Sequence, residues 1–398
     1  MSADSPVPVS TALGDVVRAY WPILVVAFLV SAVLTPLCRR FALRRGIVDK
    51  PDEWLKPHVK PIPYLGGVAI YAGWGAGIVL ALVMFARATR TAEGLRTGPS
   101  LDWNMMIGIL LTGTVIMVLG LADDIRVLSP KVKLLGNVAA AGMLLAIGLG
   151  EDIILIATQR VYVTVEPHEA WLKLLYSVPI TVFLVVGACN ATNLIDGLDG
   201  LCSGVLGIIS IGFLILAVHL HVYGPWNPLN VARVVVTLAM LGGALGFLPY
   251  NLNPARIFMG DSGSMLLGLN SAIVLLLFAE DQQVRWMVAS LMVFGLPVAD
   301  MILTLVRRWR AQRPLMQGDR SHFYDQLIDR GWSVRRVVYV SYALTGAFVL
   351  LGCLPMFMRM RHFLLVYVAF GVLLAYAVHH LRMVRVDSPS DRPPAPSP

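Results

Sequence analysis

The feature that most constrains this chain is a succession of long apolar runs. A helix that crosses a lipid bilayer needs about 20 mostly apolar residues. Charged residues make up only 14% of the 398-residue chain and hydrophobic residues 57%, and a soluble fold of this size could not bury that much apolar surface. We therefore predict an all-α integral membrane protein with about 11 transmembrane helices, at residues 20–38, 66–86, 103–122, 134–150, 174–190, 201–220, 232–249, 264–279, 286–306, 336–356 and 362–381.

Basic residues predict the orientation. Most of the 32 lysines and arginines fall in the loops after odd-numbered segments and in the C-terminal tail. Such residues stay preferentially on the cytoplasmic side, so we expect the N-terminus outside and the C-terminus inside. The first segment lacks a small-residue cleavage site, so we expect it to remain as a helix. The formal net charge of +8 fits this topology and contact with membrane lipid, and nucleic acid is not an expected partner.

The remaining segments complete the predicted organisation. Residues 1–19 form an external N-terminus, 20–381 a single polytopic membrane domain, and the proline-rich residues 382–398 a disordered cytoplasmic tail. Apolar and polar residues alternate over 151–167, with several β-branched positions, which predicts a short external β-hairpin.

Acidic residues collect at the predicted inner ends of the helices. Asp123 and Asp124 follow the third segment, with Lys131 and Lys133 shortly after. Adjacent carboxylates repel each other, which favours a bound divalent cation or a raised pKa. The alternative is a solvated loop in which the pair forms a salt bridge with Arg126.

A second polar string, NATNLIDGLDGLCSG, follows the fifth segment. Asn190, Asn193, Asp196 and Asp199 recur at steps of three, so neighbouring pairs lie on one face of a helix. Glycines in the string make a continuous helix doubtful, and two helix ends meeting at a polar turn would bring the same groups to one cavity. Amides and carboxylates with few basic neighbours suit a sugar, a base or Mg²⁺ better than a structural turn.

The third string, FMGDSGS, places Asp261 directly before the eighth segment. Asp and Ser at this position can cap a helix, which is the structural interpretation. The functional one makes Asp261 an oxygen ligand of Mg²⁺ that meets a diphosphate.

The loop after the ninth segment combines Arg320, His322, Tyr324 and Asp325 with further arginines. Arginine suits bidentate phosphate binding and histidine can move a proton, although a basic topology-setting loop explains the arginines equally well. Asp300, within the ninth segment, either serves the same cavity or pairs with a neighbouring helix. The loop before the second segment adds Lys60 and a stiff proline-rich stretch.

Taken together, the strings PIPYLGG, LADDIRVLSPKVKLLGN, NLIDGLDGL and FMGDSGS resemble the polyprenyl-phosphate N-acetylhexosamine-1-phosphate transferases. The resemblance covers about residues 45–335 and is closer to the WecA/TagO branch than to MraY. It implies transfer of a sugar-1-phosphate from a UDP-N-acetylhexosamine, UDP-GlcNAc or a derivative, to undecaprenyl phosphate with release of UMP. It also implies Mg²⁺ (or Mn²⁺) as cofactor, the first membrane step of a cell-surface glycan pathway, and an active site on the cytoplasmic face of the inner membrane. A homodimer is compatible with it.

The resemblance assigns roles to individual residues. Asp123 would be the general base for the lipid phosphate or, in another scheme, the nucleophile, with Asp124 beside it and His322 as a third catalytic residue. Asp261, with Asp196, would hold the metal. The remaining assignments are Asn190, Asn193, Asp196, Asp199, Phe258 and Lys60 for the nucleotide sugar, with Phe258 stacked on uracil, and Lys133 and Arg320 for phosphate.

One string departs from the family pattern. Where the family has a run of histidines, this chain has His322, Phe323, Tyr324 and Asp325, so a catalytically inactive relative is one alternative. A transporter of an anionic solute or lipid is another, and it predicts acids near mid-membrane. A CDP-alcohol phosphotransferase is disfavoured because its DGxxAR string is absent.

Overall fold

The structure is a computed structural model that describes residues 13–49, 61–91, 101–151, 170–225, 227–280, 284–312 and 322–384. These residues form a helical bundle, so the predicted fold class is confirmed, and each of the predicted apolar segments falls on helix. The first half contains α1 (Leu13–Arg45), α2 (Gly66–Thr91), α3 (Trp103–Ile125), α4 (Pro130–Ala146) and α6 (Ala170–Leu194). The second half contains α7 (Leu201–Tyr223), α8 (Leu229–Asn251), α9 (Gly260–Ala279), α10 (Val284–Val293), α11 (Gly295–Arg310), α12 (Phe323–Asp329), α13 (Val334–Cys353), the short 3₁₀ helix η2 (Leu354–Met356) and α14 (Met360–His380).

The number of spans differs in detail from the prediction. Among the described residues, nine helices are long and apolar enough to cross a membrane, or ten if the bent pair α10 and α11 counts as one span. The segment 134–150 corresponds to α4, which has only 17 residues. The segment 286–306 is not one helix, because α10 and α11 meet at an angle of 71°. Pro297, in the first turn of α11, has no N–H to continue a helix from α10.

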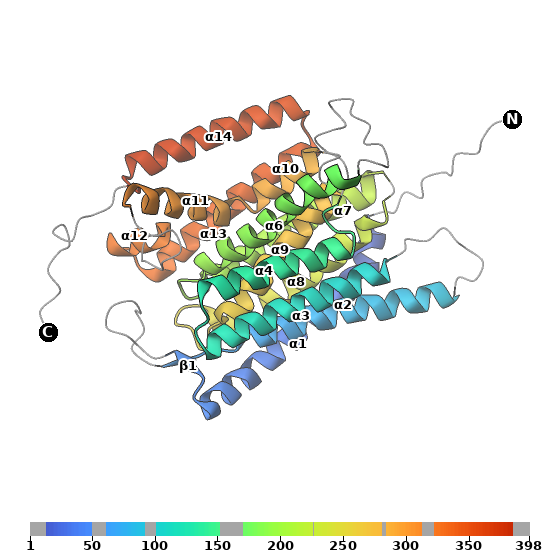
Figure 1. The fold of residues 1–398 in the computed structure, drawn as a ribbon, viewed down its shortest axis with the longest axis horizontal. Coiled ribbons are helices and arrows are strands. Elements are labelled where there is room, and N and C mark those ends of the chain that lie inside the picture. The colour runs from blue at the N-terminus through green and yellow to red at the C-terminus, as the bar shows by residue number, and fades with distance from the viewer. Residues whose placement is uncertain are drawn as a thin grey trace, which may run out of the picture.

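α9 is the central helix of the bundle (Figure 1). It contacts α6, α3, α2, α10 and α8, and every residue from Ser262 to Ala279 is buried. A helix that is apolar all round can be stable only when other helices or lipid cover it. α1 and α14 lie at opposite edges of the bundle (Figure 1).

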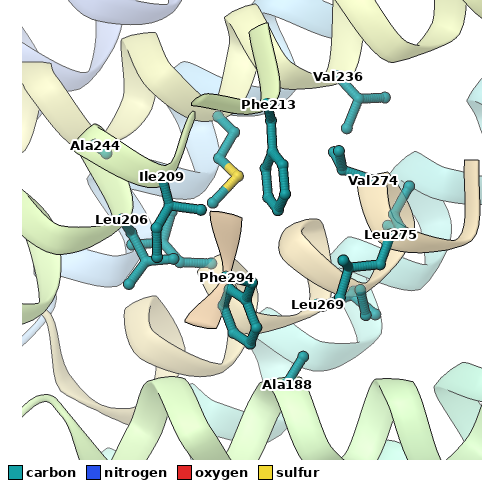
Figure 2. Packing of buried hydrophobic residues seen from close by; sticks show 14 of the residues in the cluster. Ala188, Leu206, Ile209, Phe213, Val236, Ala244, Leu269, Val274, Leu275 and Phe294 are labelled. Carbon is teal, nitrogen blue, oxygen red and sulfur yellow. The ribbon is translucent and has the colours of Figure 1, made fainter. Parts of the chain in front are cut away.

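Side chains from several helices meet around α9. Figure 2 shows this core. Phe213 of α7 and Phe294, between α10 and α11, lie there among residues of α6, α7, α8 and α9. Small residues allow the helices to approach closely. A Cβ built on Gly268 would lie 2.7 Å from the Ala188 carbonyl oxygen of α6, so only glycine fits at this crossing.

Many apolar side chains on the outside of the bundle are exposed. Phe183 is 71% exposed, Leu350 72% and Leu365 68%. Exposed apolar surface on this scale needs a lipid environment. The chain is therefore a multi-pass membrane protein.

Short elements lie where the sequence predicted none. Val48–Asp49 (β1) and Ile62–Pro63 (β2) pair as antiparallel strands, and α12 interrupts the loop after α11. The predicted hairpin at 151–167 lies outside the described residues except for its first residue, as do residues 1–12 and 385–398 of the predicted terminal segments.

Candidate active site

Two carboxylates and one ammonium group meet at one end of the bundle. Asp123 lies in the last turn of α3, Lys133 in the first turn of α4, and Asp261 in the first turn of α9. The Lys133 Nζ lies 2.6 Å from Asp123 Oδ2 and 2.5 Å from Asp261 Oδ2. The three side chains are 11%, 30% and 24% exposed in the order Asp123, Lys133, Asp261, so the cluster is shielded but reachable from solvent.

α6 adds an amide to this cluster. The Asn193 side-chain nitrogen donates to Asp261 Oδ1 at 2.9 Å and to the Ser264 hydroxyl at 3.1 Å. Asp261 is therefore held from α4 and α6 together. The structure thus brings together four of the predicted site positions, Asp123, Lys133, Asn193 and Asp261, which span almost 140 residues of the chain.

Asp124 has a different environment from Asp123. Its Oδ1 accepts from the Asp261 N–H at 2.7 Å, and its Oδ2 accepts from the Ser262 N–H at 3.2 Å and hydroxyl at 2.8 Å. Asp124 thus caps the N-terminus of α9, where free N–H groups and the helix dipole favour a negative charge. The cap that the sequence suggested for Asp261 or Ser262 comes from another helix.

Asp199 and Asp196 lie in the turn between α6 and α7. Asp199 Oδ2 accepts from the Asn253 side chain and from the Ala255 N–H, each at 2.9 Å, so it fastens this turn to the loop before α9. The Asp196 carboxylate makes no hydrogen bond or ion pair with any described residue. Removal from bulk water, and then the negative charges of Asp261 and Asp124, raise the pKa of Asp196 well above its ordinary value.

The other predicted nucleotide-binding residues are more dispersed. Asn190 is exposed and donates to the Val186 carbonyl of its own helix at 2.7 Å. Phe258 is half-buried, and its ring lies 6.3 Å from that of Tyr64. Its backbone N–H bonds to the Pro63 carbonyl, which joins the PIPYLGG string to the loop before α9. Lys60 and Arg320 lie outside the described residues.

His322 is buried at the start of α12. Its Nδ1 lies 2.8 Å from Asp300 Oδ2 and 3.2 Å from the Thr304 hydroxyl, and its ring stacks on Tyr324 with a centroid distance of 5.2 Å. Asp300 also accepts from the Phe323 N–H at 3.0 Å. Asp300, the acid inside the ninth predicted segment, therefore holds the start of α12.

The donor set at the Asp123 and Asp261 cluster fits Mg²⁺. This ion binds oxygen ligands and is usually held by one or two carboxylates together with substrate phosphates. No group of three or more acidic, histidine or cysteine side chains at metal-binding distance occurs in the described part of the chain. The two carboxylates, which already share one cation in Lys133, suit an ion whose other ligands come from a diphosphate.

Sequence reasoning missed Asn251 and Tyr342, which shape the site, and it named Tyr324 without its partner. Asn251 accepts from the Gly200 N–H at 3.1 Å and from the Ser203 hydroxyl at 2.9 Å, and it donates to the Ile257 carbonyl. Tyr342 donates to the Gly200 carbonyl, and Tyr324 to the Leu194 carbonyl. Apart from Ile257, which is six residues from Asn251, their partners lie 48 to 142 residues away, and no local pattern reveals such pairings.

One family model and several known proteins are similar to this chain in sequence. Residues 106–279 match the model of glycosyl transferase family 4. The chain is 33% identical to the probable undecaprenyl-phosphate N-acetylglucosaminyl 1-phosphate transferase of Bacillus subtilis, with 80% of this chain and 81% of the relative covered. It is 33% identical to the decaprenyl-phosphate N-acetylglucosaminephosphotransferase of Mycobacterium tuberculosis, over 80% and 78%. A phospho-N-acetylmuramoyl-pentapeptide-transferase of Bacillus mycoides is 28% identical, over 82% and 94%.

Proposed function

Because the chain belongs to the polyprenyl-phosphate hexosamine-1-phosphate transferases of glycosyl transferase family 4, we propose that it transfers N-acetylhexosamine 1-phosphate from a UDP-sugar to undecaprenyl phosphate. UDP-N-acetylglucosamine is the preferred donor candidate, since the Bacillus subtilis and Mycobacterium tuberculosis relatives carry N-acetylglucosamine in their names. UMP leaves, and the lipid-linked sugar enters a cell-surface glycan pathway.

The observation that carries this proposal is the cluster of Asp123, Lys133 and Asp261. The reaction brings a lipid phosphate and a diphosphate together, so several negative charges must be neutralised at once. A phosphate oxygen of the acceptor forms a bond to the β-phosphorus of the donor, and the bond from this phosphorus to the bridging oxygen breaks. A shared ammonium group between two carboxylates is suited to organise such charges.

The residues of the cluster would have different roles. Lys133 would bind phosphate oxygens, and Asp123 would position the lipid phosphate, which needs little deprotonation near neutral pH because its second pKa is about 6. Asp261, steadied by Asn193, would hold Mg²⁺, and Asp196 would face the same ion or its nucleotide. Bound Mg²⁺ supplies Lewis-acid neutralisation of the diphosphate.

The transporter alternative is less well supported by the location of the acids. It predicts carboxylates near the middle of the membrane. Asp123 and Asp261 instead lie in the last turn of α3 and the first turn of α9. A site at helix ends suits a reaction between a lipid in the bilayer and a soluble nucleotide, and the distribution of basic residues supports the cytoplasmic face of the inner membrane.

The proposal is tested by turnover of the purified full-length protein. The assay contains undecaprenyl phosphate, Mg²⁺ and one UDP-sugar at a time, and follows UMP and lipid-linked product. We expect UMP release that requires both lipid and Mg²⁺, with UDP-N-acetylglucosamine among the active donors, and no turnover by Asp261→Asn. Folded wild-type protein that is silent with every donor, or full activity of Asp261→Asn, would contradict the proposal.

A further inference from the structure

The helix α12 rests on the turn that carries Asp196. Its first residues are held by Asp300 of α11, which accepts from the His322 ring at 2.8 Å and from the Phe323 N–H at 3.0 Å. Asp325 accepts from the His322 N–H at 3.3 Å and completes a capping box. The string in which this chain departs from the family pattern therefore builds a short, buried and well-anchored helix.

Tyr324 connects α12 to α6. Its side chain is buried, and its hydroxyl donates to the Leu194 carbonyl at 2.8 Å. This carbonyl is one of the last in α6, where no further helical N–H is available to it. Burial raises the pKa of Tyr324 well above its ordinary value, so the hydroxyl keeps the proton that it donates.

The contact between Tyr324 and the turn is close. A Cβ built on Gly197 would lie 2.2 Å from the Tyr324 hydroxyl oxygen, so the tyrosine fills the space above this glycine. The far end of the same turn is held by Tyr342, whose hydroxyl donates to the Gly200 carbonyl at 2.5 Å. Both ends of the turn are thus fixed by tyrosine hydroxyls from separate helices.

The Asp196 carboxylate depends on these backbone anchors. It makes no hydrogen bond with a described side chain or backbone group, so its position follows from the backbone of residues 194–200. We propose that Tyr324 is a positioning residue, which fixes the turn between α6 and α7 and thereby places Asp196 for the nucleotide sugar. The part of this inference that concerns the nucleotide sugar rests on the proposed function.

The hydroxyl of Tyr324 is what the inference requires. Tyr324→Phe keeps the ring that stacks on His322 and removes only the hydrogen bond to Leu194. The matched control is Tyr339→Phe, because Tyr339 is 65% exposed and lies on α13. With UDP-N-acetylglucosamine as donor, we expect the KM of Tyr324→Phe for the donor to rise about threefold to tenfold, the effect of one lost hydrogen bond. The kcat should stay within about twofold, and Tyr339→Phe should match the wild type.

A second pair of variants tests the same contact from the other side. Gly197→Ala would displace Tyr324 without altering it and should reproduce the rise in KM. Gly187→Ala on α6 is its control, since a Cβ there meets nothing within 4 Å. If Tyr324→Phe does not fold, the KM values of this pair test the inference alone. An unchanged KM in both Gly197→Ala and Tyr324→Phe would overturn the inference.

Hydrogen–deuterium exchange separates this inference from the proposed function. Peptides covering residues 194–201 should exchange faster in Tyr324→Phe than in the wild type and in Tyr339→Phe, whether or not a donor is turned over. A silent wild type with faster exchange in Tyr324→Phe would refute the proposed function and retain Tyr324 as the residue that fixes the turn. Unchanged exchange would refute the role of Tyr324 itself.

Discussion

At the scale of single residues, the site depends on one lysine that is shared by two aspartates. Lys133 contacts the carboxylates of both Asp123 and Asp261. Both carboxylate oxygens of the neighbouring Asp124 instead accept hydrogen bonds from the N-terminus of α9. Two adjacent aspartates therefore have different tasks, one toward the proposed substrates and one toward the fold. This division makes distinct predictions for each residue.

The first prediction concerns Lys133. Lys133→Ala leaves two carboxylates facing each other without their shared cation, so they repel each other and a phosphate. We expect kcat/KM to fall about tenfold or more, as for the loss of charge-assisted hydrogen bonds. Lys131→Ala is the control, because Lys131 lies in the same helix and carries the same charge but is exposed. Equal activity of the two variants would contradict the specific role given to Lys133.

The second prediction concerns Asp124. In Asp124→Asn, one of the two accepting oxygens becomes an NH₂ group that faces N–H or O–H donors of Asp261 and Ser262. We expect a loss of about 1–3 kcal/mol in stability, seen as a lower apparent melting temperature of the purified protein, together with reduced turnover. Asp261→Asn should lose turnover without a comparable fall in melting temperature. The reverse pattern would exchange the roles given to the two residues.

The sequence was informative about residue types and less so about partners. The steps of three in the second polar string predicted that Asn193 and Asp196 serve one site, and Asn193 does contact Asp261. It could not predict that Asp199 binds the Asn253 side chain and the Ala255 N–H, because that contact depends on how α8 returns to the same end of the bundle. The hydrogen bond from the Tyr324 hydroxyl to the Leu194 carbonyl could not be predicted for the same reason.

At the scale of elements, α9 is placed by small residues on its neighbours. A Cβ built on Gly120 of α3 would lie 2.5 Å from the Ser262 Cα, and one built on Gly67 of α2 would lie 2.3 Å from the Gly263 nitrogen. These backbones touch directly, which brings Asp124 within reach of the first N–H groups of α9. The close crossing is thus a condition for the geometry of the site.

The third prediction follows from this crossing. Gly120→Ala should force α3 and α9 apart and lower stability by about 1–3 kcal/mol, with a fall in turnover because Asp123 and Asp261 move relative to each other. Gly142→Ala in α4 is the matched control, since a Cβ there meets nothing within 4 Å. That variant should be neutral or slightly more stable. Thermal unfolding of both proteins in detergent, with turnover measured in parallel, tests the difference, and a tolerant Gly120→Ala would contradict the close packing.

Helix location could be predicted from apolar runs, but breaks within helices could not. The run 286–306 is continuous in hydropathy, yet it bends by 71° between Val293 and Gly295. A Cβ built on Gly295 would lie 2.3 Å from the Phe348 ring, so the bend is fitted to a side chain of α13. Hydropathy reports the surroundings of a segment and not its direction.

At the scale of the whole molecule, the carboxylate cluster lies at the same end of the bundle as the basic last turn of α1, which contains Arg44 and Arg45. Lys133 belongs to the cluster, and Arg39, six residues before the end of α1, donates to the Arg256 carbonyl in the loop before α9. The charge bias that predicts a cytoplasmic location therefore applies to the proposed active site as well. Orientation and function are coupled, and a measurement of the first constrains the second.

The last prediction tests this orientation with single cysteines in a background where Cys38 and Cys353 are replaced by serine, since Cys189 and Cys202 are buried. Val127, four residues after Asp123, is 96% exposed, and Tyr223, at the end of α7, is 75% exposed. In intact spheroplasts, a membrane-impermeant maleimide should label Tyr223→Cys and spare Val127→Cys, and lysis should make Val127→Cys reactive. The opposite labelling would place the carboxylate cluster outside the cell, where a cytosolic UDP-sugar could not reach it, and would remove the basis for the proposed reaction.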